Sequence, residues 1–191
     1  MKKIDRDGLI LCELQAKAFE LSFSTQMCSS EIFIRRFMNS KMAVELDNLS
    51  ILQTNLQAKD MIERVIEEYG AIVYGSVKYS PDELYWIGYI YRYYSYTYGD
   101  SSLHAYKIVK PKELRGLYYP YHSLDPAQAI DRILEAKGLA LSSEEEERRQ
   151  FEIYKRIKNS CYDIPTIAPG RVAESAYDDY INACNKREHI K

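Results

Sequence analysis

The chain has 191 residues, and its 26 Lys and Arg against 28 Asp and Glu give a net charge of −2. This length fits one domain, or one domain with an appendage, and the charge gives no general reason to bind nucleic acid or an anionic membrane. Tyrosine is in excess, with 18 residues against 5 Phe and 1 Trp. Of these tyrosines, 14 lie between Tyr69 and Tyr121.

The sequence predicts a cytoplasmic protein without a membrane span. Glu13, Lys17 and Glu20 interrupt the N-terminal segment, so it lacks the apolar region of a signal peptide. No apolar run reaches the ~18 residues that a membrane-spanning helix needs. The 4 cysteines form no C-x-x-C pair, and we interpret them as reduced, mainly buried thiols that hold no metal.

Apolar residues recur at helical spacing along the chain, which predicts an all-α fold, a single orthogonal helical bundle. In the first predicted helix, residues 5–26, one apolar stripe contains Leu11, Leu14, Ala18 and Leu21. A second helix begins at Ser29 or Ser30, and a short helix follows within residues 39–48. The next helix covers residues 58–69 and ends at Gly70. The segment AIVYGSVKY, residues 71–79, has an extended pattern but no second strand to pair with, so we expect a loop.

The central helix, residues 81–98, has the clearest boundaries. Ser80, Pro81 and Glu83 form an S-x-x-E capping box with proline at the first helical position, and Gly99 ends the helix. A short helix to about residue 109, a turn at 111–119 and a helix at 126–137 follow. Residues 1–138 then form a helical body, and residues 139–191 a helical C-terminal appendage.

At 100° per residue, the central helix has two different faces. One face must pack in the core, because it holds Trp86, Ile87, Ile90, Tyr91, Tyr94 and Tyr98. The opposite face holds Tyr85, Tyr89, Arg92 and Tyr96, with Tyr93 at its border. Gly88 and Ser95 lie between the two faces, where small residues let a neighbouring helix approach closely.

Three interpretations of the second face remain open. The helix is covered on all sides, with each tyrosine ring buried and its hydroxyl bonded. Alternatively Tyr85, Tyr89, Arg92, Tyr93 and Tyr96 are a protein-binding surface, since tyrosine and arginine are enriched at interface hot spots. The third interpretation, stacking of single-stranded nucleic acid on the rings, also needs a basic groove, and residues 69–125 carry a net charge of only +1.

A basic segment follows the central helix and resembles a helix-turn-helix in outline. Its cationic residues are His104, Lys107, Lys110, Lys112 and Arg115. One hypothesis is a transcriptional regulator that contacts DNA through Lys107, Lys110, Lys112 and Arg115. The alternative is an ordinary solvated surface.

The sequence contains no motif typical of catalysis, so we predict that the protein is not an enzyme and uses no cofactor or metal. Three histidines without H-x-x-x-H spacing are too few for a convincing metal centre. The best remaining arrangement is PYHSLDP, where His122 and Asp125 could share a hydrogen bond. The alternative is that Asp125 caps the next helix and His122 belongs to the entry of that helix. An enzyme of unfamiliar type, centred on His122 and Tyr119, is a lesser hypothesis.

A resemblance to known proteins is carried by the segment from Tyr74 to Ala136, which includes YSPDELYWIGYIYRYYSYTYGDSS, and by RRFMNS and SKMAVELDN upstream. These strings resemble a group of uncharacterised small proteins from gut Firmicutes, over about 110 residues. Members of that group tend to be encoded beside ADP-ribosyltransferase-like toxins, in the manner of a toxin-antitoxin cassette. The resemblance implies an antitoxin-like or accessory component that binds a protein partner such as the toxin, without chemistry of its own. The sequence leaves self-association open.

Two further expectations follow from the antitoxin-like role. Antitoxins usually act by covering an active site, which requires an interface. The segment from Ser142 to Asn185 is the candidate element to wrap a partner. The glutamates from Glu144 to Glu147 would suit a basic pocket.

Overall fold

The structure is a computed structural model that describes residues 2–50, 55–139 and 151. The chain divides into two units, residues 1–140 and 141–191, and the first unit contains all of the helices reported below. The predicted appendage and its candidate wrapping segment lie outside the described residues, apart from Leu139 and Phe151. Cys12 and Cys28 are free, buried thiols, as predicted.

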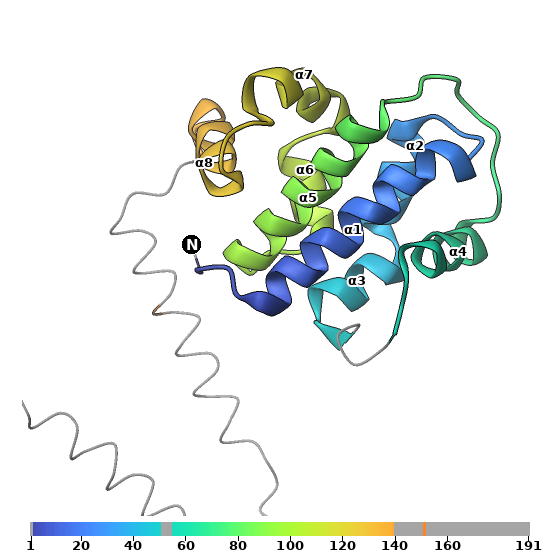
Figure 1. The fold of residues 1–191 in the computed structure, drawn as a ribbon, viewed down its shortest axis with the longest axis horizontal. Coiled ribbons are helices and arrows are strands. Elements are labelled where there is room, and N and C mark those ends of the chain that lie inside the picture. Colours follow the sequence, from blue (N-terminus) through green and yellow to red (C-terminus); the bar gives the residue numbers. More distant parts are fainter. Residues whose placement is uncertain (1, 51–54, 140–150, 152–191) are drawn as a thin grey trace, which may run out of the picture. The chain divides into compact units, whose positions relative to one another are not determined.

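The described part of the chain is all-helical, as the sequence predicts (Figure 1). Its helices are α1 (Arg6–Thr25), α2 (Ser30–Asn39), α3 (Lys41–Asp47), α4 (Ala58–Tyr69), α5 (Pro81–Tyr98), α6 (Ser102–Ile108), α7 (Pro111–Tyr121) and α8 (Pro126–Ala136). The predicted ranges for α4 and α5 are confirmed, as is the loop between them. In the described residues, no helix is both long and apolar enough to cross a membrane.

One element is more regular than expected. Residues 111–121 form a helix, α7, where the sequence suggested only a turn at 111–119. Pro111 begins this helix at its first position, and the buried side chains of Pro111 and Leu114 anchor it to the core. Pro120 lies inside the helix, in its last turn, which is why the sequence understated its length.

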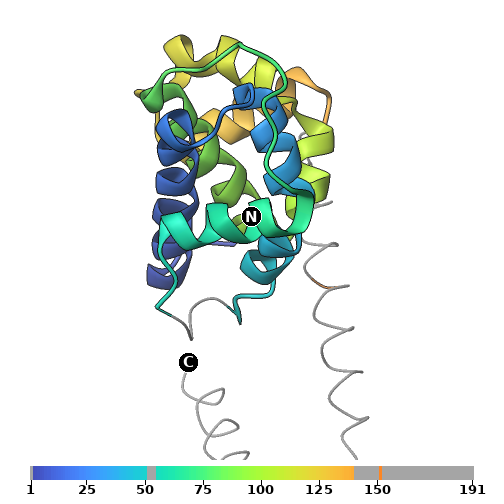
Figure 2. The same ribbon diagram turned by 90° about the vertical axis from the view of Figure 1, so that its right-hand side faces the viewer.

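Helix α5 is the centre of the bundle, packed against α1 on one side and against α6, α7 and α8 elsewhere. Figures 1 and 2 both show α1 and α5 side by side. Both ends of α5 are fixed as predicted: the Ser80 hydroxyl accepts a hydrogen bond from the Glu83 amide, and Gly99 adopts the left-handed conformation with φ 63°.

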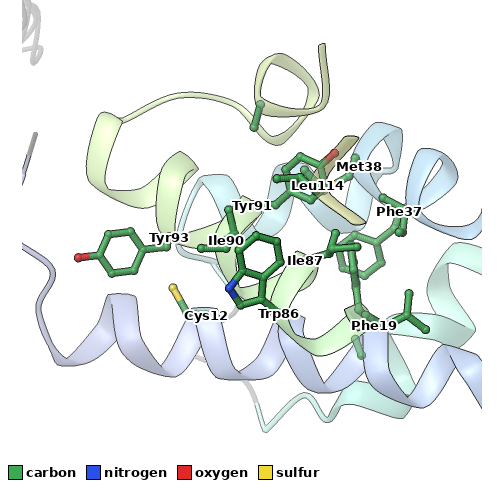
Figure 3. Close-up of a cluster of buried hydrophobic side chains, with 14 of the residues drawn as sticks. Cys12, Phe19, Phe37, Met38, Trp86, Ile87, Ile90, Tyr91, Tyr93 and Leu114 are labelled. Carbon is green, nitrogen blue, oxygen red and sulfur yellow. The ribbon is translucent and has the colours of Figure 1, made fainter. Parts of the chain in front are cut away.

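The apolar core lies mainly between α1, α2 and α5 (Figure 3). Phe19 of α1 meets Phe33 and Phe37 of α2 edge to face, with ring centroids 5.6 and 4.9 Å apart. This is the favoured geometry for aromatic pairs. On the other side of α5, Trp86 meets the ring of Tyr118, and the Tyr91 hydroxyl donates to the Val109 carbonyl at 2.6 Å. The core thus surrounds α5.

Gly88 lets α1 and α5 cross closely. A Cβ atom at this position would lie 2.9 Å from Cγ of Phe19 and 3.0 Å from both Cα of Ala16 and the carbonyl oxygen of Gln15. The Ala16 and Gln15 atoms belong to the backbone of α1, so they cannot rotate away. The prediction that Gly88 permits close approach of a helix is confirmed, and that helix is α1.

Beside this crossing lies a buried polar network centred on Arg92, whose side chain is 1 % exposed. Its Nε donates to Oε1 of Gln15 at 2.9 Å, and a terminal nitrogen binds Oδ1 of Asp47 at 2.7 Å. Its other terminal nitrogen donates to the Ser102 hydroxyl at 2.7 Å, and Asp47 accepts from both the hydroxyl and the amide of Ser102. The network therefore joins α1, α3, α5 and α6.

Gln15 completes this network. Its side-chain amide donates to the Gly88 carbonyl at 3.1 Å, while its oxygen accepts from Arg92. Every charged or amide group at the centre is thereby bonded, as burial requires. The interpretation of Arg92 as an exposed partner-binding residue is wrong, because the guanidinium is inside the bundle.

We predict that Gly88→Ala destabilises the fold by about 1–3 kcal/mol, because overpacking at the crossing outweighs the better helix propensity of alanine. The matched control is Gly116→Ala in α7, where a Cβ would meet nothing within 4 Å. The free energy of unfolding of that variant should rise by about 0.5–1 kcal/mol, because alanine is favoured over glycine inside a helix. Chemical denaturation measures both. An equal rise in the free energy of unfolding of the two variants would contradict the close crossing of α1 and α5.

We predict that Arg92→Met lowers the free energy of unfolding by about 3–5 kcal/mol, because Asp47 and Gln15 lose a buried partner. The control is Arg64→Met, which removes a more exposed pair, with Arg64 2.6 Å from a carboxylate oxygen of Glu45. Its cost should stay below about 1 kcal/mol. Equal costs for the two substitutions, measured by urea denaturation, would rule out a structural role for the network.

Candidate protein-binding surface

The second face of α5 is not a free surface, because α1 lies on it. Arg92 and Tyr93 are buried, while Tyr85, Tyr89 and Tyr96 are half-buried. This arrangement agrees with the interpretation in which other parts of the chain cover the helix, but Tyr85, Tyr89 and Tyr96 keep part of their surface exposed. The neighbour of the tyrosine face is therefore another helix of the same chain.

Two tyrosine hydroxyls on this face bond to acidic residues of the N-terminal region. Tyr85 donates to a carboxylate oxygen of Glu13, and this bond, together with Lys17, lowers the pKa of Glu13. Burial, and then the same bond, raises the pKa of Tyr85. The rings of Tyr85, Tyr89 and Tyr93 stack along the helix with neighbouring centroids 6.4 and 6.3 Å apart.

Tyr96 fixes the start of α1 to the end of α5. Its hydroxyl donates to Oδ1 of Asp5 at 2.5 Å, and the same carboxylate caps α1 by accepting from the Gly8 amide at 2.9 Å. Lys2 adds a contact to Asp5 at 3.2 Å. The bond from Tyr96, followed by that from Gly8, lowers the pKa of Asp5 to about 2.

An open cleft runs along α1, and we call it the α1 cleft. Its walls are Arg6, Asp7, Leu9, Ile10, Leu11, Glu13, Leu14 and Lys17 of α1, the segment Leu56, Gln57 and Ala58, and Tyr89. Its volume is about 760 Å³. Leu9 and Ile10 are 46 % and 47 % exposed, so two large apolar side chains of a regular helix face water. Of the predicted partner-binding residues, Tyr89 lines this cleft.

The charged residues at the α1 cleft balance one another. Arg6 and Lys17 oppose Asp7 and Glu13, and Lys17 lies 3.0 Å from a carboxylate oxygen of Glu13. A neutral, mixed rim around apolar residues is typical of protein–protein interfaces and differs from the basic groove that nucleic acid requires. The α1 cleft is therefore the candidate site for a protein partner.

Sequence reasoning missed Leu9 and Ile10. The predicted apolar stripe of α1 contains Leu11 and Leu14 but not Leu9 or Ile10, so it gave no expectation for these two side chains. The signal was the run Leu9, Ile10, Leu11 near the start of the helix. Three consecutive apolar residues span 200° of a helix, so they cannot all enter one buried face.

The basic segment is partly held by the body of the protein. Arg115 binds Oε1 of Glu83 at 3.1 Å, and its guanidinium lies 4.5 Å from the ring centroid of Tyr79. Lys110 lies 4.0 Å from the ring centroid of Tyr106. Lys107 and Lys112 are exposed. These contacts give two of the four predicted DNA-contacting residues a structural role.

His122 and Asp125 serve the ends of two helices. Nδ1 of His122 lies 3.1 Å from the carbonyl oxygens of Tyr118 and Tyr119, at the end of α7. Asp125 accepts a hydrogen bond from the Ala127 amide at 2.9 Å and caps α8. The interpretation of Asp125 as a helix cap is confirmed. Among residues 2–50 and 55–139, no group of three or more His, Cys, Asp or Glu side chains is arranged to hold a metal ion.

We predict that Asp5→Asn destabilises the protein at neutral pH and that this difference shrinks as the pH falls from about 4 towards 2. The pKa of Asp5 is lowered from 3.8 to about 2 in the fold, so its carboxylate stabilises the folded state above pH 3.8 and stops doing so on protonation. Thermal unfolding of both proteins between pH 7 and pH 2 measures this. A constant difference in Tm would contradict the bond to Tyr96.

Comparisons with family models, with curated proteins and with solved structures gave no match to this chain.

Proposed function

We propose that this is a non-enzymatic interaction protein that binds a protein partner through the α1 cleft. The observation that carries the proposal is the exposure of Leu9 and Ile10 inside a cleft with a neutral charged rim. An exposed apolar patch with polar surroundings is the usual mark of a protein-binding surface. The resemblance of residues 74–136 to small proteins encoded beside ADP-ribosyltransferase-like toxins supports a partner encoded beside this chain.

The structure of α1 suits such a role. Its buried face is fixed by the crossing at Gly88, by the Arg92 network and by the Asp5 cap, so the helix is rigid before a partner arrives. A preorganised surface loses little entropy on binding. Apolar side chains on a rigid helix also favour a partner with a complementary apolar ridge.

In this proposal, the protein covers part of its partner's surface. It does so either to block the partner's activity or as an accessory component. Such a mechanism needs an interface of sufficient area and no reacting group. Tyr89 contributes an aromatic ring to one wall, and burial raises the pKa of its hydroxyl to about 12.

We predict that Ile10→Asp weakens partner binding more than tenfold, because an interface hot spot contributes at least ~2 kcal/mol and a carboxylate in an apolar contact is costly. The probe is the product of the adjacent gene, co-expressed with the tagged chain and recovered by affinity purification. The matched control is Val44→Asp in α3, at a site with 54 % exposure. Both variants should keep their thermal stability.

If Ile10→Asp recovers as much partner as the wild-type chain, the α1 cleft is not the binding site. The same holds if the Val44→Asp control loses as much partner as Ile10→Asp. Charge substitution at Arg92 is unsuitable for this test, because it disrupts the buried network and with it the fold.

A further inference from the structure

We infer that His104 is a nucleophilic histidine that accepts a phosphoryl group on Nε2 from a small activated phosphoryl donor. Three side chains make up the site. They are His104 itself, Asp100, which orients the imidazole ring, and Lys107, which supplies a neighbouring positive charge. The site shares no residue with the α1 cleft and does not depend on the proposed function.

The carboxylate of Asp100 determines which ring nitrogen of His104 is reactive. Its Oδ2 accepts a hydrogen bond from Nδ1 of His104. Because an ionised carboxylate can only accept, Nδ1 carries the proton and Nε2 keeps its lone pair. A carboxylate bonded in this way also raises the basicity of the opposite ring nitrogen. Nε2 of His104 is therefore the nucleophilic atom.

Asp100 is itself held in place by its neighbours. Its amide donates to the Ser95 carbonyl at 3.0 Å, and the Tyr94 hydroxyl donates to Oδ2 at 3.1 Å. The other carboxylate oxygen, Oδ1, accepts from the Ser101 amide at 2.9 Å. The side chain of Asp100 is only 18 % exposed. The carboxylate is thus in position to orient His104 before a donor arrives.

The imidazole of His104 is accessible from solvent. Its side chain is 54 % exposed, and in the described part of the chain no group hydrogen-bonds to Nε2. Ser102 and Ala105 are the buried residues of α6, so His104 lies on the outer side of this helix. A small donor can therefore reach Nε2 without a change in the fold.

The charges around His104 favour an anionic donor. Residues 101–112 contain three lysines and no acidic residue. Lys107 follows His104 by three positions on α6, a spacing that makes two side chains neighbours on a helix. It is exposed, and no carboxylate of the described residues forms an ion pair with it. Its ammonium group can bind the oxygens of a phosphoryl group.

The transfer requires no proton to leave the ring. Nε2 attacks phosphorus and forms the N–P bond, while the bond from phosphorus to the leaving group breaks. With phosphoramidate as the donor, ammonia leaves with the electron pair of that bond and with its own protons. The positive charge formed on the imidazole is stabilised by Asp100, through the proton that stays on Nδ1. Lys107 offsets the negative charge of the phosphoryl oxygens.

Phosphoramidate and the full chain, near pH 8, provide the test, because an ordinary imidazole is neutral there. Peptide mass spectrometry at neutral pH measures the phosphorylation rate of each histidine separately. His122 is the internal control, since it is exposed and its Nδ1 lies 3.1 Å from the carbonyl oxygens of Tyr118 and Tyr119 rather than beside a carboxylate. His104 should react at least about threefold faster than His122, because the rate follows the basicity of the nucleophile.

Two variants test the neighbours of His104. Asp100→Asn keeps a hydrogen-bond acceptor and loses the charge, so the rate at His104 should fall to about that of His122. Lys107→Gln should lower the rate at His104 about twofold, because the donor is anionic. The control Lys112→Gln should leave that rate unchanged. In every variant, the rate at His122 and the circular dichroism spectrum should match those of the wild type.

Equal rates at His104 and His122 in the wild type would overturn the inference. An unchanged rate at His104 in Asp100→Asn, or in Lys107→Gln, would overturn it as well. Ile10→Asp should be phosphorylated like the wild type, and Asp100→Asn should bind the protein partner like the wild type. The outcome for His104 is thereby independent of the outcome for the α1 cleft.

Discussion

The close crossing of α1 and α5 is the constraint on which the rest of the structure depends. Gly88 removes the side chain that would separate the two helices, and its carbonyl then lies within reach of the Gln15 side-chain amide of α1. Once the helices are this close, the tyrosines of the second face of α5 cannot reach solvent except at their edges. The buried Arg92 network and the bond between Tyr96 and Asp5 both depend on this short separation.

The excess of tyrosine follows from the central position of α5. A helix covered on all sides needs large side chains in every direction, and phenylalanine would satisfy that need as well. Tyrosine differs by its hydroxyl, which extends beyond the ring and bonds the next element. Tyr91 bonds Val109 in this way, Tyr98 bonds Asp131 of α8 at 3.2 Å, and Tyr96 bonds Asp5. The hydroxyls thus join α5 to elements on several sides.

The individual helices and their ends could be predicted from the sequence, but which residues of other helices pack against them could not. The capping box at Ser80, the terminal Gly99 and the small residue Gly88 are short-range signals, and each has the predicted role. Arg92 could not be assigned, because its burial depends on Gln15, Asp47 and Ser102, which lie far apart in the chain. Leu9 and Ile10 in the α1 cleft also depend on tertiary structure, since their exposure follows from which faces of α1 the other helices cover.

The Arg92 network also constrains how the sequence can vary. Its four side chains come from four helices: Arg92 bonds the other three, Asp47 and Ser102 also bond each other, and Gln15 bonds Arg92 and the Gly88 carbonyl. A change at one position therefore leaves a buried group without its partner. Positions 15, 47, 92 and 102 should therefore change together among related chains, either keeping Gln, Asp, Arg and Ser or replacing the whole set with an apolar one. Such a coordinated pattern identifies distant relatives even where the exposed residues of the cleft have diverged.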